Sequence, residues 1–330
     1  MAHADVSFEG DLRLRYESTQ REPGEDAQRE RYRLRGGARW QPRERLELAA
    51  RLATGTGDPA SANLDFGESL SRDEIRLDRL YAAWTAAPGL RLFAGKMKNP
   101  LFRPGDTPLA WDGDYNPTGL ALAAERERWF ARAGAFLADR RDGGPDARLF
   151  AVQAARRFEP ADSASLTLGA GWSEYTNMAG HPPLYGRPRN NTLAAASYRE
   201  DFAIAEVFGE LEWSLGGRPL LAYAQWSSNT EAAAEDVAWT FGMKYGDSEV
   251  PGRASFSWAW RDTEADALVG TFTDSDFAEG ATGSRGHVLK SEYGVTSWLA
   301  VSATLYLATI RMAGGETDVD KLMLDFEFSF

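Results

Sequence analysis

Hydrophobic and polar residues alternate one by one along much of the chain. In the last segment Leu322, Leu324, Phe326, Phe328 and Phe330 occupy every second position, and mostly polar residues lie between them. Successive side chains of a β-strand point to opposite faces, so each such segment predicts a strand with one apolar and one polar face. A helix would repeat its apolar positions every 3.6 residues, which these segments do not do.

Sixteen segments of this kind are predicted as strands. Many span about 10–14 residues, whereas strands of soluble proteins average about 5–6 and membrane-spanning strands need about 9–11. The predicted strands cover residues 4–18, 29–40, 45–55, 72–86, 90–97, 117–124, 128–139, 146–158, 164–175, 200–213, 219–228, 236–246, 253–263, 285–294, 298–311 and 319–330.

The connections between these strands are expected to be short and long strictly in turn. Short turns rich in turn-favouring residues are predicted at 41–44, 86–89, 125–127, 214–218, 247–252 and 295–297. Long polar segments are predicted at 55–71, 98–116, 176–199 and 264–284. Outer-membrane barrels have short periplasmic turns and long outer loops, and an even number of strands places both termini on the periplasmic side.

The arginines on the polar faces indicate the surroundings of those faces. Arg31, Arg33, Arg35 and Arg39 follow one strand, and such a face cannot border a dry core without a large desolvation cost. The pattern therefore predicts an all-β fold: a closed antiparallel transmembrane β-barrel of about 16 strands, with the polar face toward the lumen and the apolar face toward lipid. Closure is expected because an unpaired strand edge is too costly in hydrocarbon.

Tryptophans near the predicted strand ends suit the aromatic girdles of such barrels, although ordinary packing is the alternative for any one of them. They are Trp40, Trp84, Trp129, Trp213, Trp260 and Trp298.

Composition narrows the class of protein. The chain contains no Cys, which excludes disulfides and thiolate metal sites, and its formal net charge of -12 argues against nucleic acid as a partner. No run approaches about 18 consecutive apolar residues, so no membrane-spanning helix is predicted. We expect residues 1–330 to form one domain. Ala2-His3-Ala4 has the form of a signal-peptidase site, which predicts that residues 1–4 are the remnant of the cleavage site of an exported protein.

Three passages resemble the putative porin family of Gram-negative bacteria. Residues 95–100 are similar to that family's segment entering its third outer loop, and residues 111–120 are similar to the return strand. The third passage is 273–277, followed by Gly280, Gly286 and His287. A terminal Phe330 on an alternating strand resembles the signal read by the barrel-assembly machinery. The resemblance implies a barrel of about sixteen strands and a pore function, names no solute, and leaves a homotrimer open.

The most prominent chemical feature is a ladder of arginines. If all face the lumen, they form a basic pore wall; the alternative is an ion-paired lattice with Glu9, Asp11, Glu17 and Glu47 that stiffens the barrel. The ladder consists of Arg13, Arg15, Arg31, Arg33, Arg35, Arg39, Arg51 and Arg76.

The segment 98–116 is expected to be the third outer loop and to fold into the barrel. Asp106, Asp112 and Asp114 would then face the arginines, and opposed charges across a narrow pore would orient dipolar solutes and set ion preference. The alternative for Asp112 and Asp114 is hydrogen bonding within a turn.

The sequence also contains candidate residues for a metal site and for a catalytic site. Asp274, Asp276 and Glu279 offer oxygen ligands for Ca²⁺, but the set is incomplete and a solvated acidic loop is the stronger reading. No other metal site, no cofactor and no catalytic residue is predicted, because His287 has no convincing partner in Ser284 or Ser291.

The sequence therefore predicts a bacterial outer-membrane porin rather than an enzyme. We expect a water-filled channel for passive diffusion of small polar or anionic solutes, in contact with outer-membrane lipid and lipopolysaccharide. A structural barrel that acts as a scaffold or sheath for a multi-protein complex is one alternative. A soluble β protein that folds without detergent is the other.

Overall fold

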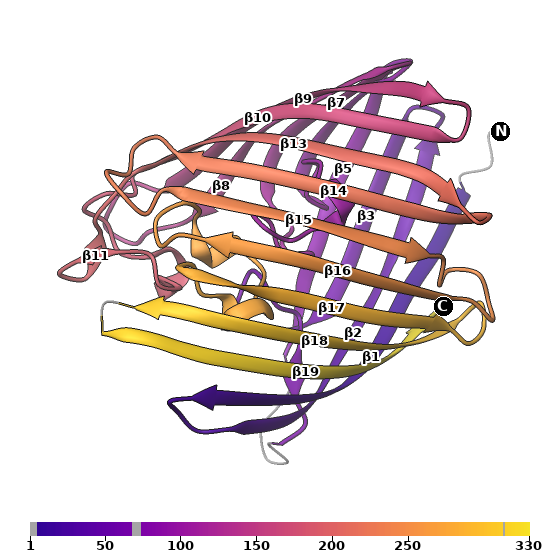
Figure 1. Cartoon of the computed structure of the whole chain (residues 1–330). Helices are drawn as coiled ribbons and strands as arrows, with labels where there is room; N and C mark the ends of the chain where they lie inside the picture. The colour runs from indigo at the N-terminus through magenta and orange to yellow at the C-terminus, as the bar shows by residue number, and fades with distance from the viewer. Residues whose placement is uncertain (1–4, 68–73, 313) are drawn as a thin grey trace.

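The computed structural model describes residues 5–67, 74–312 and 314–330, and sixteen long antiparallel strands close into one ring (Figure 1). The predicted closed barrel is thereby confirmed. The strands are β1 (Asp5–Glu22), β2 (Ala27–Arg43), β3 (Leu46–Thr54), β5 (Ile75–Ala87), β6 (Leu90–Lys96), β7 (Thr118–Arg126), β8 (Trp129–Asp139), β9 (Ala147–Ala161), β10 (Ala164–Thr176), β13 (Phe202–Leu215), β14 (Arg218–Asn229), β15 (Val237–Gly246), β16 (Ala254–Thr263), β17 (Ser284–Gly294), β18 (Leu299–Met312) and β19 (Gly315–Ser329).

Every predicted strand coincides with one of these sixteen. Three further strands of two residues each lie in segments expected to be loops: β4 (Leu64–Asp65), β11 (Leu193–Ala194) and β12 (Ser197–Tyr198). The expected signal-peptide remnant at residues 1–4 lies outside the described residues, as do the first two residues of the predicted strand 72–86.

The ring closes between the first and last strands. β1 pairs antiparallel with β19, with Asp11 opposite Ser329. Gly10 and Phe330 exchange backbone hydrogen bonds of 2.7 and 3.0 Å. Closure pairs the backbone groups of both strand edges, which a barrel in hydrocarbon requires.

Side chains alternate between the two faces of the wall as the sequence pattern predicts. On β19, Leu322, Leu324 and Phe326 are exposed on the outside, whereas Met323 and Asp325 between them are buried on the inside. The same alternation gives the whole barrel an apolar outer surface and a polar inner one.

Five of the six girdle tryptophans lie at the same rim, beside the short turns, and are exposed on the outer surface. The sixth, Trp260, lies near the opposite end of β16. The five are Trp40, Trp84, Trp129, Trp213 and Trp298. They mark the level at which this rim meets the membrane interface.

The two rims differ, but less regularly than expected. The rim with the tryptophans, which is expected to be the periplasmic one, carries short connections such as 44–45, 88–89 and 127–128. The outer rim carries long loops and also short connections at 23–26, 140–146 and 230–236. The expectation of strict alternation in length is therefore wrong, because several outer hairpins continue their strand pairing beyond the apolar belt.

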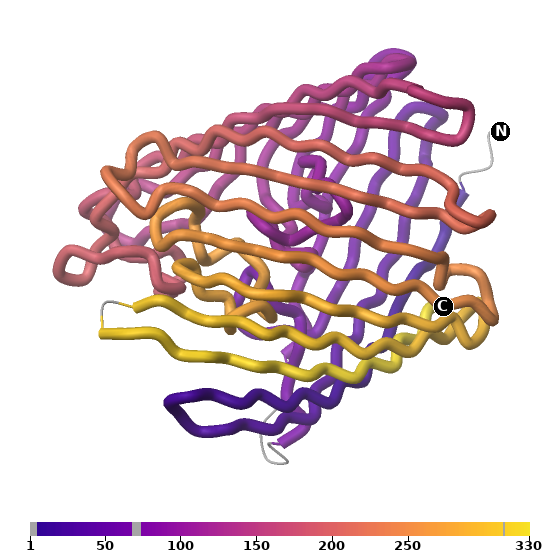
Figure 2. The backbone as a smooth tube through the Cα atoms, viewed as in Figure 1, coloured from indigo at the N-terminus to yellow at the C-terminus, as the bar shows by residue number. Residues whose placement is uncertain are grey.

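Two outer loops fold into the lumen, L3 (residues 97–117) and L7 (264–283), and a third, L5 (177–201), lies across the outer end of the barrel (Figure 2). They contain the 3-10 turns η1 (Pro104–Asp106), η2 (Leu184–Gly186), η3 (Gly270–Phe272) and η4 (Phe277–Gly280). No helix in the described part of the chain is long and apolar enough to cross a membrane.

The three loops share an apolar core inside the outer mouth of the barrel. Phe272 of L7 is fully buried, and its ring centroid lies 4.4 Å from that of Tyr115 in L3 and 6.1 Å from that of Tyr175. Met97, Leu184 and other residues of the three loops complete this core. The expectation that 176–199 and 264–284 are simply polar loops is therefore wrong, because L7 folds inward as well as L3, and L5 packs against L7.

Candidate functional site in the barrel lumen

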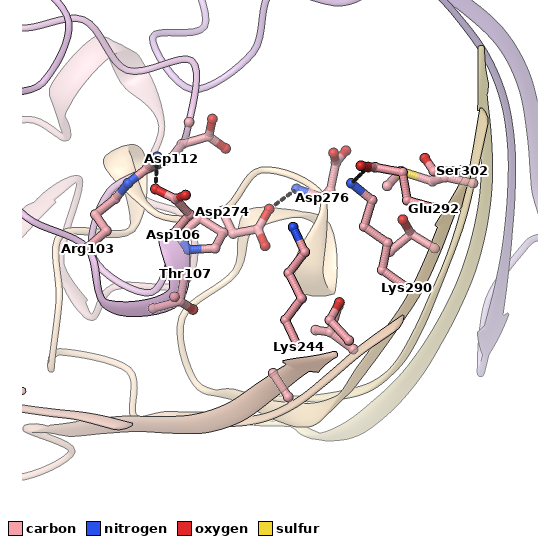
Figure 3. A pocket seen from close by; sticks show the side chains of 18 of the residues that line it. Arg103, Asp106, Thr107, Asp112, Lys244, Asp274, Asp276, Lys290, Glu292 and Ser302 are labelled. Carbon is pink, nitrogen blue, oxygen red and sulfur yellow. Dashed lines mark hydrogen bonds and ion pairs between the residues drawn. The ribbon is translucent and has the colours of Figure 1, made fainter. Parts of the chain in front are cut away.

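A cavity of about 660 Å³ lies in the lumen, between L3 and L7 on one side and the inner wall on the other (Figure 3). Carboxylates outnumber cations in its lining. The carboxylates are Asp106, Asp112, Asp114, Glu210, Glu212, Asp274, Asp276, Glu292, Asp325 and Glu327. The cations are Arg13, Arg15, Arg33, Arg103, Lys244, Arg261 and Lys290.

The arginine ladder is divided among several places. Arg13, Arg15 and Arg33 line the cavity, and Arg35 and Arg51 form partly buried ion pairs on the same inner wall. Three members lie apart from the cavity: Arg31 pairs with Glu17, Arg39 pairs with Glu9 near the periplasmic rim, and Arg76 pairs with Glu74 at the exposed outer end of β5.

Arg15 is the most thoroughly paired arginine of the wall. It is 5 % exposed, and its Nε and Nη2 donate to the two carboxylate oxygens of Asp325 at 2.7 and 2.9 Å. Its Nη1 donates to Asp276 of L7 at 2.8 Å. Two carboxylates therefore hold one guanidinium in a fork geometry that fixes both its position and its charge.

Asp114 brings L3 against the arginine strands. Its carboxylate lies 3.2 Å from Arg35 and 3.5 Å from Arg33, and both arginines also contact Asp11 at 2.7 and 2.9 Å. Burial would raise the pKa of Asp114, but the guanidiniums of Arg33, Arg35 and Arg13 outweigh it and hold that pKa below the ordinary value. Asp114 therefore stays ionised at the junction of loop and wall.

The other two acidic residues of L3 have different surroundings. Asp112 accepts the backbone N–H groups of Asp114 at 2.7 Å and Ser275 at 2.9 Å, so it joins L3 to L7. Burial, together with the nearby carboxylates of Asp114 and Asp274, raises the pKa of Asp112 well above the ordinary value, despite these two hydrogen bonds. The side chain of Asp106 is 95 % exposed, and the group paired with it is Arg103, at 3.7 Å.

Two strands on the far wall hold L3 in place. The N–H of Phe102 donates to Oε1 of Gln153 on β9 at 2.7 Å, and Nε2 of Gln153 donates to Glu206 on β13 at 2.6 Å. Gln153 and Glu206 are both buried. The sequence analysis missed these two residues that anchor L3. Both are polar members of inward-facing rows, so the alternation of the strands could have pointed to them.

The tip of L3 touches the same wall. The N–H of Gly105 donates to Glu210 at 2.5 Å. A Cβ at Gly105 would lie 2.1 Å from the ring of Tyr223, and its φ of +60 is in the left-handed region. Only glycine lets the loop approach this closely.

The three carboxylates considered for Ca²⁺ do not converge. Asp274 pairs with Arg261, Asp276 with Arg15, and Glu279 with Arg21. Among the described residues, no group of three or more His, Asp or Glu side chains is placed to hold a metal ion. Each of these carboxylates is therefore paired with an arginine, and the geometry gives no support to a calcium site.

Lys244 on β15 was also missed by the sequence analysis. Figure 3 shows its side chain pointing into the cavity, and within the described ranges it makes no hydrogen bond or ion pair. Lys290, on the same side, pairs with Glu292. Lys244 is therefore the cation of this cavity whose charge is not balanced by direct contact.

His287 and the nearby serines form no catalytic arrangement. Nδ1 of His287 accepts a hydrogen bond from the indole of Trp258 at 3.2 Å. The hydroxyl of Ser284 donates to the carbonyl oxygen of Ala281 at 2.7 Å.

Comparison with known proteins identifies the family. A family model described as "Putative porin" matches residues 19–203 and 193–330. No curated protein matches the chain.

Solved structures with the same fold are outer-membrane porins. OprB of Pseudomonas putida at high pH is 14 % identical, with a TM-score of 0.64 over 98 % of this chain and 94 % of that one. A triple mutant of the Rhodopseudomonas blastica porin is 13 % identical, with a TM-score of 0.55 over 98 % of this chain and 100 % of that one. OmpT of Vibrio cholerae lacking loop L8 is 12 % identical, with a TM-score of 0.57 over 99 % of each chain.

At such identities the structural matches bear on the fold alone, whereas the family model covers most of the chain. Family and fold together indicate a channel of the bacterial outer membrane rather than an enzyme. The chain belongs to the putative porin family.

Proposed function

We propose that the lumen cavity beside L3 is the route by which small polar solutes diffuse across the outer membrane. The observation that carries the proposal is a polar cavity of about 660 Å³ enclosed by a closed barrel, with L3 anchored on both sides of it. An arginine-rich wall faces the acidic L3 where Asp114 meets Arg33 and Arg35, and we infer that this contact sets the narrow part of the pore.

We further infer a mild preference for cations over anions. The arginines of the wall are balanced by carboxylates at short distance. The whole lining holds ten carboxyl groups and seven cationic side chains, so negative charge stays in excess even with Asp112 neutral. A cleft with an excess of one sign concentrates ions of the other sign. This proposal replaces the anionic solutes expected from the sequence, because that expectation gave the basic pore wall more weight than the ion-paired alternative.

The structural-barrel alternative is weaker on this geometry. A sheath needs an open lumen for a second protein, but the apolar core of L3, L5 and L7 occupies the outer mouth. No observation on this chain favours a sheath over a pore.

Single-channel recording in a planar bilayer tests the proposal. We expect discrete conductance steps and, under a salt gradient, a reversal potential on the cation-selective side. A folded, inserted protein without conductance would contradict the pore and favour the scaffold; a clear anion-selective reversal would contradict the charge argument alone.

A homotrimer, which the resemblance left open, stays a proposal, as do the contact with lipopolysaccharide and the recognition of Phe330 by the barrel-assembly machinery. The mass of the detergent-solubilised complex tests the first. Deletion of Phe330, with the folded barrel quantified in outer membranes, tests the last.

A further inference from the structure

One sector of the outer surface carries an unusual row of side chains at the periplasmic rim. Trp129 on β8 is 56 % exposed, and its direct cross-strand neighbours are Arg126 on β7 and Arg156 on β9. Directly opposed residues of neighbouring strands share a face, so both arginines project outward with Trp129. The guanidinium of Arg156 lies 5.1 Å from the Trp129 ring centroid and 4.9 Å from that of Phe158.

The other rim tryptophans have apolar neighbours at the same positions. Trp40 lies between Val6 and Leu48, Trp84 between Leu46 and Leu92, and Trp213 between Ala164 and Leu220. The Arg–Trp–Arg row therefore departs from a pattern that the barrel otherwise repeats.

The two arginines of this row have no ion-pair partner in the part of the chain that the structure describes. Of the acidic residues near these turns, Glu125 pairs with Arg132 and Glu159 lies 3.7 Å from Arg128, whereas Glu127 is exposed and forms an ion pair with neither arginine of the row. Two outward guanidiniums without an ion-pair partner, at the level of the membrane interface, offer a binding position for an anion.

An apolar groove of about 470 Å³ lies on the same outer surface, and its lining on β8 begins at Ala133, four residues along the strand from Trp129. Small residues form its floor, because Ala133 lies between Leu122 and Val152, and Ala135 lies between Leu120 and Phe150. Glu174 lines the far end.

The row and the groove together span about one leaflet of a bilayer. The distance from position 129 to position 135 is roughly 20 Å along a strand. Strand tilt reduces this to roughly half of the ~30 Å hydrocarbon thickness.

We propose that this surface binds one anionic phospholipid of the periplasmic leaflet. An acyl chain lies in the alanine-floored groove, and the phosphate lies between Arg126 and Arg156 beside the indole of Trp129. Guanidinium forms charge-assisted hydrogen bonds with phosphate and at the same time stacks on aromatic rings, which suits Arg156 in particular. The proposal rests on the outer-membrane location and is independent of whether the lumen conducts.

Native mass spectrometry of the purified barrel with added phosphatidylglycerol or phosphatidylcholine tests this site. We expect the wild type to retain one phosphatidylglycerol in preference to phosphatidylcholine. The Arg126→Gln/Arg156→Gln variant should bind phosphatidylglycerol about thirtyfold more weakly. Arg218→Gln is the matched control: Arg218 is an exposed rim arginine whose direct cross-strand neighbour is Leu215 rather than a tryptophan, and its loss should change nothing.

Equal retention of both lipids by the wild type would overturn the proposal, as would unchanged binding in the double variant. A double variant that changes the subunit number rather than the lipid retention would also overturn it, since the surface would then be a contact between copies of the chain.

A second variant tests the groove separately from the charges. Ala133→Trp fills the floor and leaves both arginines in place, so it should also weaken retention; unchanged retention would refute the acyl-chain position. Heat-modifiable mobility on unboiled gels and unaltered conductance would show that each variant is folded.

Discussion

The lumen has two walls that use charge in opposite ways. On β1, β2 and β19, inward arginines such as Arg15 and Arg33 are each held by more than one carboxylate. On β15 and β16, Lys244 lacks a direct partner and its neighbours in the cavity lining are hydroxyls such as Ser255 and Ser257. The first wall carries many charges that neutralise one another at short distance. The second wall carries fewer charges, and one of them, on Lys244, has no direct partner.

This contrast teaches that the number of charged residues on a strand does not measure the field in the lumen. Buried ion pairs fix geometry, since the desolvation cost of two charges leaves little net gain unless both are well placed. We therefore assign rigidity and the position of L3 to the arginine wall, and a larger share of ion preference to the groups without partners.

The largest effect is expected when one member of a buried pair is removed. Arg15→Met leaves Asp325 and Asp276 without their shared cation and should lower the free energy of unfolding by about 3–5 kcal/mol. Arg39→Met is the control: its pair with Glu9 is about half exposed, and its loss should cost at most about 1 kcal/mol. Urea unfolding in detergent measures the free energy of unfolding of both variants. Equal losses would contradict the distinction between buried and exposed pairs.

The apolar core of the mouth should behave differently from the wall. Phe272→Ala removes a fully buried ring whose loss in an ordinary core costs about 3–5 kcal/mol. Here we expect the cost to appear as loosening of L3 and L7, because the sixteen strands are paired without Phe272. Single-channel conductance should become larger and noisier while the unfolding temperature of the barrel stays near that of the wild type. A large drop in that temperature with unchanged conductance would contradict this division.

The sequence predicted the barrel well because strand alternation is a local signal. All sixteen strands and the outward rows follow from a period of two, and the inward direction of Arg33 follows with them. The partners of these arginines could not be predicted in the same way. Asp276 and Asp114 reach the wall from loops, and the contact of Asp325 with Arg15 depends on how the last strand registers with the first.

The inward folding of L7 and the packing of L5 against it were missed for a related reason. Leu268, Val269 and Phe272 lie in a segment without a regular period, so their apolar character was outweighed by the polar residues around them. An apolar triplet in a loop of a porin-like sequence is better interpreted as a contact within the lumen.

Substitutions of cations on the two walls should both change ion selectivity, but only those on the arginine wall should also lower stability. Lys244→Gln removes a free cation and should shift the reversal potential toward cations without changing the unfolding temperature. Arg33→Gln should shift it in the same direction but also destabilise the wall, because Asp11 and Asp114 lose a partner. The Arg33→Gln/Asp114→Asn double variant should return selectivity toward the wild type. If Lys244→Gln leaves the reversal potential unchanged, the free charge of the second wall does not govern ion preference.

The smallest effect concerns pH at the junction of L3 and L7. The raised pKa of Asp112 means that the folded loops favour its neutral form, so the stability it contributes is complete below the ordinary Asp pKa of about 3.9 and is lost as pH rises through the raised value. The charged form is disfavoured by burial and by the carboxylates of Asp114 and Asp274. We therefore expect the frequency of brief closures of the wild-type channel to change with rising pH, as the junction loosens. Asp112→Asn, which is neutral at every pH, should remove that dependence and leave the reversal potential nearly unaltered. A variant that keeps the full pH dependence would assign it to another group and leave Asp112 a purely structural link between the two loops.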